Sequence, residues 1–368
     1  MSAAAQATLI DARIGESRFP VHVGAGLVDR LDEVWPADAG GTTLLVHDAA
    51  VADVAVRVAT ALARRGLRVA SEAVPSGERS KSLGQVERLA RAAAVSGIRR
   101  SDTVVAVGGG VVGDLAGFLA AGYQRGVRLV HVPTTLLAMV DSAIGGKTGV
   151  DLPEGKNYFG AIWQPELVAM DIATLATLPA RELSAGFAEV VKYGLLEGGE
   201  LGERIAGWPA LPGPSDALVR LIVDCVRHKL RIVAEDERDL GIRATLNFGH
   251  TVGHGIEAAA GYERYLHGEA ISLGMLAALR VSERHAGLEP QWRARTVAAL
   301  ERHGLPTVLD ASVETSAILA AMGRDKKADA TALNMVLLEA PGRPLIRQDP
   351  PMHVVVDAIE ELRVGAAA

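Results

Sequence analysis

Short apolar runs alternate with helical patterns through the first half of the chain. Residues 7–14 and 17–23 predict two strands that meet at Gly15-Glu16 as a hairpin. Further apolar runs predict buried strands at 43–47, 67–74, 103–107 and 129–132, and helical periodicity lies at 50–65, 81–96 and 114–121. Strands that alternate with helices form a parallel sheet that is covered on both faces. We therefore expect an α/β, Rossmann-like domain.

The pattern changes after residue 179, where helical periodicity dominates. It runs through residues 182–198, 216–234, 247–260, 268–286, 291–303 and 312–323. A late strand pair at 334–338 and 345–347 and a last helix at 354–363 complete the prediction. A chain of 368 residues suggests roughly two domains. We expect a nucleotide-binding α/β domain at residues 1–179 and a mainly α-helical domain at residues 180–368.

Composition and charge exclude several classes of protein. With 49% hydrophobic and 22% charged residues the chain is not a disordered protein. A net charge of -6 repels nucleic acid and acidic membrane surfaces. The single Cys225 rules out an intrachain disulfide and fits a reducing compartment. It lies in a predicted helix, where we expect its side chain to pack in the hydrophobic core. The sequence has no leader-like start and no membrane-length apolar run, so we expect a cytosolic protein.

A glycine-rich turn, Gly108-Gly-Gly-Val-Val-Gly113, follows a predicted strand and opens a helix. Backbone N–H groups in this setting bind a pyrophosphate, although any tight strand-to-helix turn also favours glycine. The acidic residue that the usual dinucleotide fingerprint places about 20 positions later is missing, because Val132-Pro-Thr-Thr135 lies there. Asp48 and Glu78 follow other strands, whose carboxyl ends share one sheet edge. Dinucleotide binding is the favoured interpretation.

Histidines and a carboxylate form a candidate metal site. Asn247, His250 and His254 fall at i, i+3 and i+7, which share one helix face. His267 opens the next predicted helix, and Glu189 lies on an earlier one. Imidazoles with one carboxylate leave an open position on zinc, as in catalytic sites. Spacing does not choose among the three histidines, nor whether Glu189 is a ligand or the partner of Lys192 in a surface ion pair.

Cationic side chains gather near these motifs. Lys147 and Lys156 are flanked by glycines in predicted loops, and Lys192, Lys229, Arg243, Lys326 and Lys327 come from neighbouring segments. A solvated surface is the usual explanation for any single lysine. If several of them converge, the ligand is a small polyanion that carries both carboxylate and phosphate.

The ordered set of motifs closely resembles the 3-dehydroquinate synthase family of sugar phosphate cyclases. The resemblance runs through the segments at 108–118, 132–138, 145–149, 155–157, 177–182, 188–194, 246–254 and 266–269, among them Leu-Asn-Phe-Gly-His-Thr-Val-Gly-His and Leu-His-Gly-Glu. It is dense over roughly residues 75–275 and looser elsewhere. The chain departs from the family at Asp239, where Glu is usual, and in the loop at 151–155.

The resemblance implies a homodimer that binds NAD and Zn²⁺, with Co²⁺ as a substitute. The implied metal ligands are Glu189, His250 and His267, which leaves His254 facing the substrate. Implied NAD contacts are Asp48, Glu78, Lys81, Gly110, Val111, Val112, Gly113, Asp114, Thr134, Thr135, Lys147, Lys156, Thr174, Leu175 and Thr177. Implied catalytic and substrate contacts are Asp141, Lys147, Asn157, Lys192, Lys229, Arg243, Asn247 and His254, with Arg125 reaching a neighbouring subunit's phosphate site.

The implied reaction belongs to the shikimate pathway, towards chorismate and the aromatic amino acids. It converts 3-deoxy-arabino-heptulosonate 7-phosphate, a small phosphorylated sugar acid, to 3-dehydroquinate and phosphate. Alcohol oxidation, β-elimination, reduction, ring opening and aldol closure follow one another, so NAD is regenerated. The alternatives are a metal-dependent alcohol or glycerol dehydrogenase, another sugar-phosphate cyclase such as a 2-deoxy-scyllo-inosose synthase, and a non-catalytic NAD-binding sensor.

Overall fold

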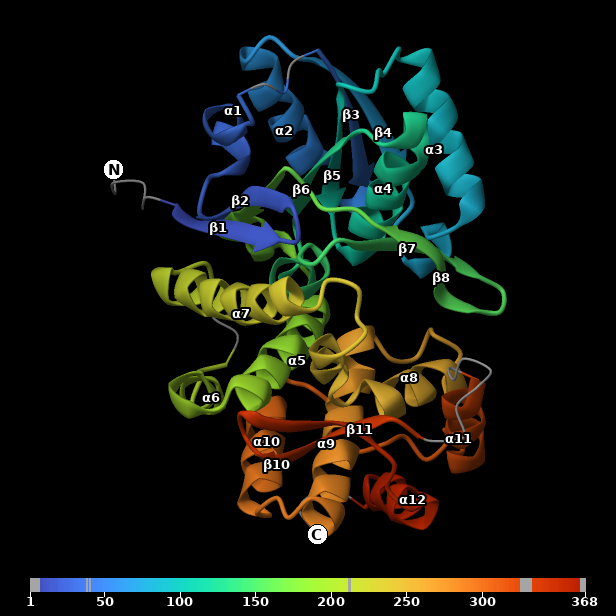
Figure 1. The fold of residues 1–368 in the computed structure, drawn as a ribbon. Coiled ribbons are helices and arrows are strands. Elements are labelled where there is room, and N and C mark those ends of the chain that lie inside the picture. The colour runs from blue at the N-terminus through green and yellow to red at the C-terminus, as the bar shows by residue number, and fades with distance from the viewer. Residues whose placement is uncertain (1–6, 38, 40, 211–212, 325–332, 365–368) are drawn as a thin grey trace. The chain divides into compact units, whose positions relative to one another are not determined.

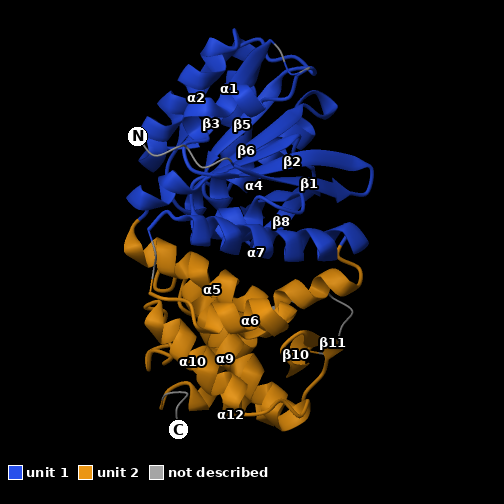
Figure 2. Cartoon of the chain, turned by 90° about the vertical axis from the view of Figure 1, so that its left-hand side faces the viewer, with its two compact units in different colours: residues 1–178, 213–238 blue, residues 179–212, 239–368 orange. Residues whose placement is uncertain are grey.

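The computed structural model describes residues 7–37, 39, 41–210, 213–324 and 333–364, and the chain divides into two compact units (Figure 2). Unit 1 comprises Met1–Leu178 and Gly213–Arg238, and unit 2 comprises Pro179–Pro212 and Asp239–Ala368. This division differs from the predicted boundary in one helix, α7 (Asp216–Glu235). Helix α7 packs on strands of unit 1, whereas periodicity alone reports a buried face without naming its partner.

Unit 1 is built on a seven-stranded sheet with the order β1-β2-β9-β6-β5-β3-β4. Its strands are β1 (Thr8–Ile14), β2 (Ser17–Gly24), β3 (Thr42–Asp48), β4 (Arg68–Val74), β5 (Thr103–Gly108), β6 (Arg128–Pro133) and β9 (Leu167–Asp171). All neighbouring pairs are parallel except β1 with β2, which form the predicted hairpin. The expected α/β architecture is therefore confirmed.

Two hydrophobic layers cover the faces of this sheet. Short α1 (Leu31–Val34) and α2 (Ala52–Arg64) pack on one face with Leu45 and Val105. On the other face α3 (Leu83–Val95) and α4 (Gly110–Gly122) pack with Leu44 and Val104 (Figure 1). Successive strand residues point to opposite faces, so each fully apolar strand supplies both layers. Cys225 is buried in α7, as expected.

The sequence patterns missed a second hairpin of unit 1. Strands β7 (Lys147–Leu152) and β8 (Gly155–Ile162) pair antiparallel. Lys147 and Lys156 therefore lie in strands, and the prediction that they occupy loops was wrong. Strand β8 escaped notice because it is largely solvent-exposed, including Tyr158 and Phe159, so its sequence has no buried face to produce a period-2 pattern.

Unit 2 is mainly helical, as expected. Its helices are α5 (Ala180–Glu197), α6 (Gly199–Ala206), α8 (His250–Ala259), α9 (His267–His285), α10 (Gln291–Arg302), α11 (Thr315–Arg324) and α12 (Met352–Glu361), with a hairpin of β10 (Met335–Ala340) and β11 (Arg343–Gln348). Buried α9 contacts α5, α8, α10 and α12. No helix of the described residues is long and apolar enough to cross a membrane.

Glycines let the helices of unit 2 approach at backbone distance. A Cβ on Gly268 would lie 1.8 Å from the carbonyl oxygen of Ala185, and one on Gly274 would lie 2.1 Å from that of Gly249. Only a residue without a side chain fits at these crossings. Helix α9 is thereby held against α5 and α8, which places its first residue, His267, beside both helices.

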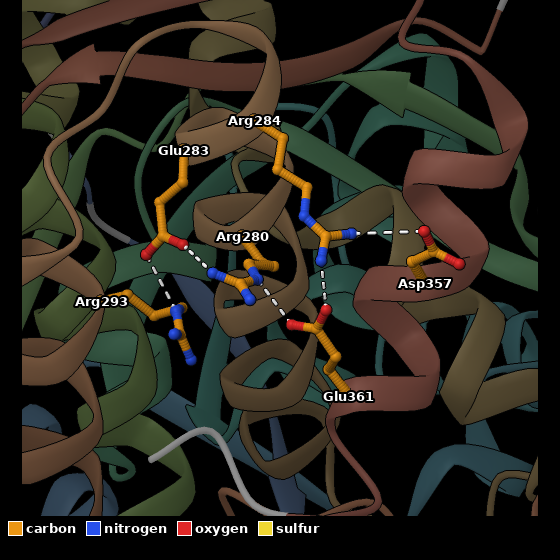
Figure 3. A network of polar contacts seen from close by, with 6 residues as sticks. All are labelled: Arg280, Glu283, Arg284, Arg293, Asp357 and Glu361. Atoms are coloured by element: carbon orange, nitrogen blue, oxygen red, sulfur yellow. Dashed lines mark hydrogen bonds and ion pairs between the residues drawn. The ribbon is translucent and has the colours of Figure 1, made fainter. Parts of the chain in front are cut away.

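An ion-pair network joins α9, α10 and α12 (Figure 3). The Glu283 carboxylate accepts hydrogen bonds from Arg280 at 2.7 Å and from Arg293 at 2.9 Å. Glu361 accepts from Arg280 at 2.5 Å and also from Arg284. Glu283 is nearly buried, with 4% of its side chain exposed, so its charge depends on these guanidinium groups.

Replacing Glu283 with Ala should destabilise unit 2 by about 3 kcal/mol, because it leaves guanidinium charge poorly compensated in a buried setting. The matched control is Glu203→Ala, which removes a carboxylate with a 58% exposed side chain from a pair with Arg295. That control should cost less than about 1 kcal/mol. Urea unfolding followed by far-ultraviolet circular dichroism measures both, and equal losses would contradict the expectation.

Candidate nucleotide and metal sites

The glycine turn links β5 to α4 in unit 1. Strand β5 ends at Gly108 and helix α4 begins at Gly110. The N-cap residue is Gly109, which has no side chain that could cap the first N–H groups of this helix. The first N–H groups of α4 therefore face outward without intrahelical acceptors. A Cβ on Gly108 would lie 3.0 Å from that of Val112, and one on Gly109 would lie 3.2 Å from Cγ2 of Thr135. The glycines keep the turn tight and its backbone accessible, which suits an anion.

The order in which the strands are added to the sheet reverses beside this turn. Strand β3 has β4 on one side and β5 on the other, so the chain order reverses between β3 and β5. Open α/β sheets bind ligands at the carboxyl ends of the strands at such a switch point. Asp48 ends β3 there, and its side chain accepts hydrogen bonds from Ser76 and from the Ala50 N–H. Its Cβ lies 3.3 Å from the position of a Cβ on Gly108.

Four of the predicted nucleotide residues form a charged cluster beside α4. Nζ of buried Lys81 lies 2.6 Å from Oδ2 of Asp114 and 3.9 Å from Oε1 of Glu78, which lies 3.7 Å from Nζ of Lys156. Burial raises the pKa of the Asp114 carboxyl, and the Lys81 ammonium opposes that rise. The sequence predicted that these residues contact the same ligand but gave no distances between them. In the structure they lie next to one another.

Apart from Lys147, which begins β7, the remaining predicted nucleotide residues lie at the same carboxyl edge of the sheet. Thr134 follows β6 and its N–H donates to the Gly108 carbonyl at 2.9 Å. Oγ1 of Thr135 accepts from the Ala138 N–H at 3.1 Å. Thr174, Leu175 and Thr177 lie in the 3₁₀ turn Ile172–Thr177 that directly follows β9. Gly110 to Asp114 form the first turn of α4.

The predicted catalytic residues of unit 1 come from several further segments, including β7, which begins at Lys147. Asp141 lies in the π-helical turn Ala138–Ser142, and Nζ of Lys229 on α7 donates to its Oδ1 at 2.8 Å. Asn157 in β8 has a positive φ of 58°, and its N–H donates to Oδ1 of Asp151 at 2.8 Å. Arg125 has a φ of 66° in an exposed turn after α4. Left-handed backbone at non-glycine residues is strained and concentrates at functional sites.

The predicted metal residues converge in unit 2. Oε1 of Glu189 lies 3.6 Å from Nε2 of His250 and 3.5 Å from Nε2 of His267. Ligands on a tetrahedral zinc, at about 2.1 Å from the ion, stand about 3.4 Å from one another. The three donor atoms lie within 4.8 Å of one another, so the cluster fits a divalent ion. The donor set of two imidazoles and one carboxylate is that of an open, catalytic zinc site.

The backbone before α8 sets the direction of His250. Phe248 is extended, Gly249 has a φ of 79°, and the helix begins only at His250. Asn247 therefore lies in the preceding 3₁₀ turn Ile242–Asn247, and the prediction that it shares a face of this helix was wrong. Nδ1 of His250 lies 3.1 Å from the Phe248 carbonyl oxygen and donates its proton there, which leaves the lone pair of Nε2 for a metal ion beside Glu189. His254 follows one turn later, and its ring centroid lies 5.2 Å from that of His250.

Glu189 and Lys192 form an ion pair inside unit 2. Both side chains are buried, so the alternative of a surface pair is wrong. Burial and the Lys192 ammonium hold the pKa of His250 well below 6.5. Burial also lowers the pKa of His267, but the carboxylates of Glu189 and Glu257 raise it to about 9. The centre thus supplies a neutral imidazole and carboxylates that attract a cation.

The motifs did not single out Glu257, whose Oε2 lies 3.5 Å from Nδ1 of His267. Its spacing of i+7 from His250 and i+3 from His254 was the available signal, because it puts a carboxylate on the histidine face of α8. Arg243 is buried in the 3₁₀ turn that precedes α8. Lys326 and Lys327 lie outside the described residues.

His131 on β6 gives a pH prediction for unit 1. It lines a small cavity beneath the glycine turn, and burial lowers its pKa from 6.5 to about 4. The unfolded chain binds this proton first as the pH falls, so stability decreases between about pH 6.5 and 4. In metal-free protein, the free energy of unfolding of the His131→Leu variant should fall between pH 7.5 and 5.0 by about 2 kcal/mol less than that of the wild type. Urea unfolding at the two pH values measures this difference. Exposed His285→Leu is the control, and parallel pH curves for wild type and His131→Leu would refute the assignment.

Comparisons with known proteins agree over most of the chain. The family of 3-dehydroquinate synthase N-terminal domains matches residues 71–185, and that of the C-terminal domains matches residues 186–328. A 3-dehydroquinate synthase from Symbiobacterium thermophilum is 45% identical over 95% of this chain and 99% of its own.

Two solved structures of sugar phosphate cyclases have the same fold as this chain. A 2-deoxy-scyllo-inosose synthase with carbaglucose-6-phosphate, NAD⁺ and Co²⁺ is 26% identical, with a TM-score of 0.88 over 96% of this chain and 99% of that one. The 2-epi-5-epi-valiolone synthase of Streptomyces hygroscopicus subsp. jinggangensis 5008, with NAD⁺ and Zn²⁺, is also 26% identical, with a TM-score of 0.81 over 95% of this chain and 98% of that one. The chain belongs to the 3-dehydroquinate synthase family.

Proposed function

We propose that this protein is a 3-dehydroquinate synthase that uses NAD and a divalent metal ion. Its substrate is 3-deoxy-arabino-heptulosonate 7-phosphate, and its products are 3-dehydroquinate and phosphate. The observation that carries the proposal is the convergence of Glu189, His250 and His267 at ligand spacing in a member of this family. Relatives of the same fold bind NAD⁺ with Co²⁺ or Zn²⁺, which supports both cofactors.

The metal is assigned to Glu189, His250 and His267. Their separations of 3.5 and 3.6 Å match the spacing of ligands around one ion. A bound divalent ion supplies Lewis acidity that polarises a substrate hydroxyl. Lys192 holds the Glu189 carboxylate in place beside the two imidazoles. The Phe248 carbonyl fixes the tautomer of His250, so that its Nε2 is the donor.

NAD is assigned to the switch point of unit 1. When bound, it supplies reversible oxidation of a substrate alcohol, so that it is needed in catalytic amount only. The N–H groups at the start of α4 bind the diphosphate, because they are donors without intrahelical acceptors. Asp48 offers a carboxylate for a ribose hydroxyl at the end of β3. Lys81 holds Asp114 and Glu78 at the edge of this cradle.

The substrate carries a carboxylate and a phosphate, and both cationic and neutral polar residues are assigned to bind it. Lys147, Asn157 and Lys229 are assigned in unit 1, and Lys192, Arg243, Asn247 and His254 in unit 2. Asp141 positions the Lys229 ammonium through two hydrogen bonds, at 2.8 Å from its side chain and 2.7 Å from its carbonyl. Oxidation next to a C–H bond acidifies it, so phosphate leaves as that proton is lost. His254 and the lysines hold the departing phosphate, whose own oxygen takes the proton.

We extend the proposal to a cytosolic homodimer. Arg125 is an exposed cation in a strained turn, and it is assigned to the phosphate site of a neighbouring copy. An arginine serves this role well because its planar group binds phosphate through two hydrogen bonds. The natural ion is taken as Zn²⁺, with Co²⁺ as a functional substitute.

Two other enzyme activities are compatible with parts of this arrangement. A metal-dependent alcohol or glycerol dehydrogenase would consume NAD in step with product and has no need of so many anion-binding residues. A 2-deoxy-scyllo-inosose synthase acts on a substrate without a carboxylate. Lys229 and Arg243 favour a carboxylate substrate, and therefore the dehydroquinate reaction.

The proposed cycle predicts much more phosphate than NADH. With the heptulosonate phosphate and a trace of NAD, the purified protein should recycle the cofactor and release phosphate in roughly tenfold or greater molar excess over the NAD present, with little bulk NADH. A coupled phosphate assay and absorbance at the NADH band measure the two. Equal amounts of NADH and product would favour the dehydrogenase, and no phosphate release would refute the proposal.

His267→Ala should lose zinc and turnover together, because one of three protein ligands is removed. We expect activity to fall at least about 100-fold, with zinc content measured by mass spectrometry after dialysis. His285→Ala, at the other end of α9, is the matched control and should retain both. Full activity in a zinc-free His267→Ala preparation would contradict the metal assignment.

Lys147→Ala should weaken the phosphorylated substrate far more than NAD. Loss of one charge-assisted contact to a phosphate costs about 1.5–3 kcal/mol, or roughly 10- to 100-fold in affinity. Titration calorimetry with NAD, and then with substrate analogue on the NAD complex, separates the two affinities. An equal loss of both would place Lys147 at the nucleotide instead.

A further inference from the structure

The imidazole of His267 lies between two buried carboxylates. Its Nε2 is 3.5 Å from Oε1 of Glu189, and its Nδ1 is 3.5 Å from Oε2 of Glu257. Glu257 is buried, with 4% of its surface exposed. A buried carboxylate at this place needs a positive or hydrogen-bonding neighbour, and the metal assignment gives it no role.

We propose that Glu257 is a positioning residue of the metal site. Its carboxylate accepts the Nδ1 proton of His267, which fixes the tautomer that turns Nε2 towards Glu189 and the ion. The proposal rests on the proposed function, because it requires the ion to bind at Glu189, His250 and His267. A carboxylate behind a ligating imidazole orients the ring and raises its basicity.

Each of the two ligating imidazoles would then donate its Nδ1 proton to an acceptor, but the two acceptors differ. Nδ1 of His250 faces the backbone carbonyl of Phe248, and Nδ1 of His267 faces a side chain. A neutral imidazole carries one proton, so an acceptor at Nδ1 leaves Nε2 as the only donor for a metal. Both Nε2 atoms face the same oxygen of Glu189, at 3.6 and 3.5 Å, so an ion bound between them would meet both lone pairs and the carboxylate.

The helices keep Glu257 and His267 in register. Glu257 lies on α8, two turns after His250, while His267 begins α9. The helices touch at Gly253, where a Cβ would lie 2.8 Å from Cδ1 of Ile271 and 3.2 Å from the Ala270 carbonyl. The carboxylate therefore reaches His267 from a neighbouring helix that already carries another ligand.

A competing arrangement uses the same residues as ligands. Donor atoms of His254, Glu257 and His267 also lie within 4.8 Å of one another. In that arrangement Glu257 would bind the ion directly, and His267 would have to use Nδ1. One neutral ring cannot serve both groups, so the two arrangements exclude each other. The convergence of two Nε2 atoms on Glu189 favours the first.

The test measures Co²⁺ affinity of the metal-free full chain without any turnover. Co²⁺ is titrated against a chelator of known affinity, and binding is read from the visible cobalt absorption. Glu257→Gln should weaken binding about 10- to 100-fold and alter the band shape while the spectrum persists. Glu257→Leu, which has no acceptor at all, should weaken it further. Glu263→Gln removes the same charge from an exposed turn nearby and should change nothing.

His250→Ala and His254→Ala complete the experiment, with circular dichroism to confirm that each metal-free variant is folded. The proposal expects His250→Ala to lose most Co²⁺ affinity and His254→Ala to lose little. Wild-type Co²⁺ affinity in both Glu257 variants would overturn the positioning role of Glu257 and leave the metal assignment intact. Loss of binding in Glu257→Gln and His254→Ala, with His250→Ala unaffected, would make Glu257 a ligand. A wild-type chain that binds no Co²⁺ would refute the metal assignment of the proposed function as well.

Discussion

A buried carboxylate organises the centre of unit 2. Glu189 has no exposed surface, and an isolated charge in that position would be very costly. Lys192, one turn along the same helix, supplies the compensating charge, and Nε2 of His250 and of His267 lie 3.6 and 3.5 Å from the carboxylate. Groups that must surround a buried charge are held to a narrow geometry. The packing around the buried Glu189 carboxylate thus places the oxygen and nitrogen ligands at the spacing that one divalent ion needs.

Close backbone packing supplies the precision that this centre needs. Helix α9 crosses α5 at Gly268 and α8 at Gly274, where any side chain would collide with a carbonyl. These crossings leave the helices little freedom to slide, so the residue next to Gly268, His267, is placed by backbone contact. Polar interactions then set only the rotation of its ring. Rigid helices hold ligand geometry better than loops do.

Unit 1 reaches a comparable result with backbone groups. A parallel sheet brings the carboxyl ends of its strands to one edge, and the strand order reverses there between β3 and β5. Asp48 and the start of α4 lie at that switch point, so an acidic group and N–H donors lie close together although they come from different strands. The proposed nucleotide site therefore does not depend on the acidic residue that the usual fingerprint carries on the next strand.

Periodicity determined most of the elements, because the spacing of apolar residues reports which face of a segment is buried. The strands at 43–47 and 103–107 and the long helices of unit 2 were predicted on that basis, and the motifs identified the family. Tertiary structure alone decided the rest: that α7 packs with unit 1, that exposed β8 is a strand, and that Glu257 lies behind His267. A pattern along the chain records burial but not the partner, and a ligand set depends on distances between partners.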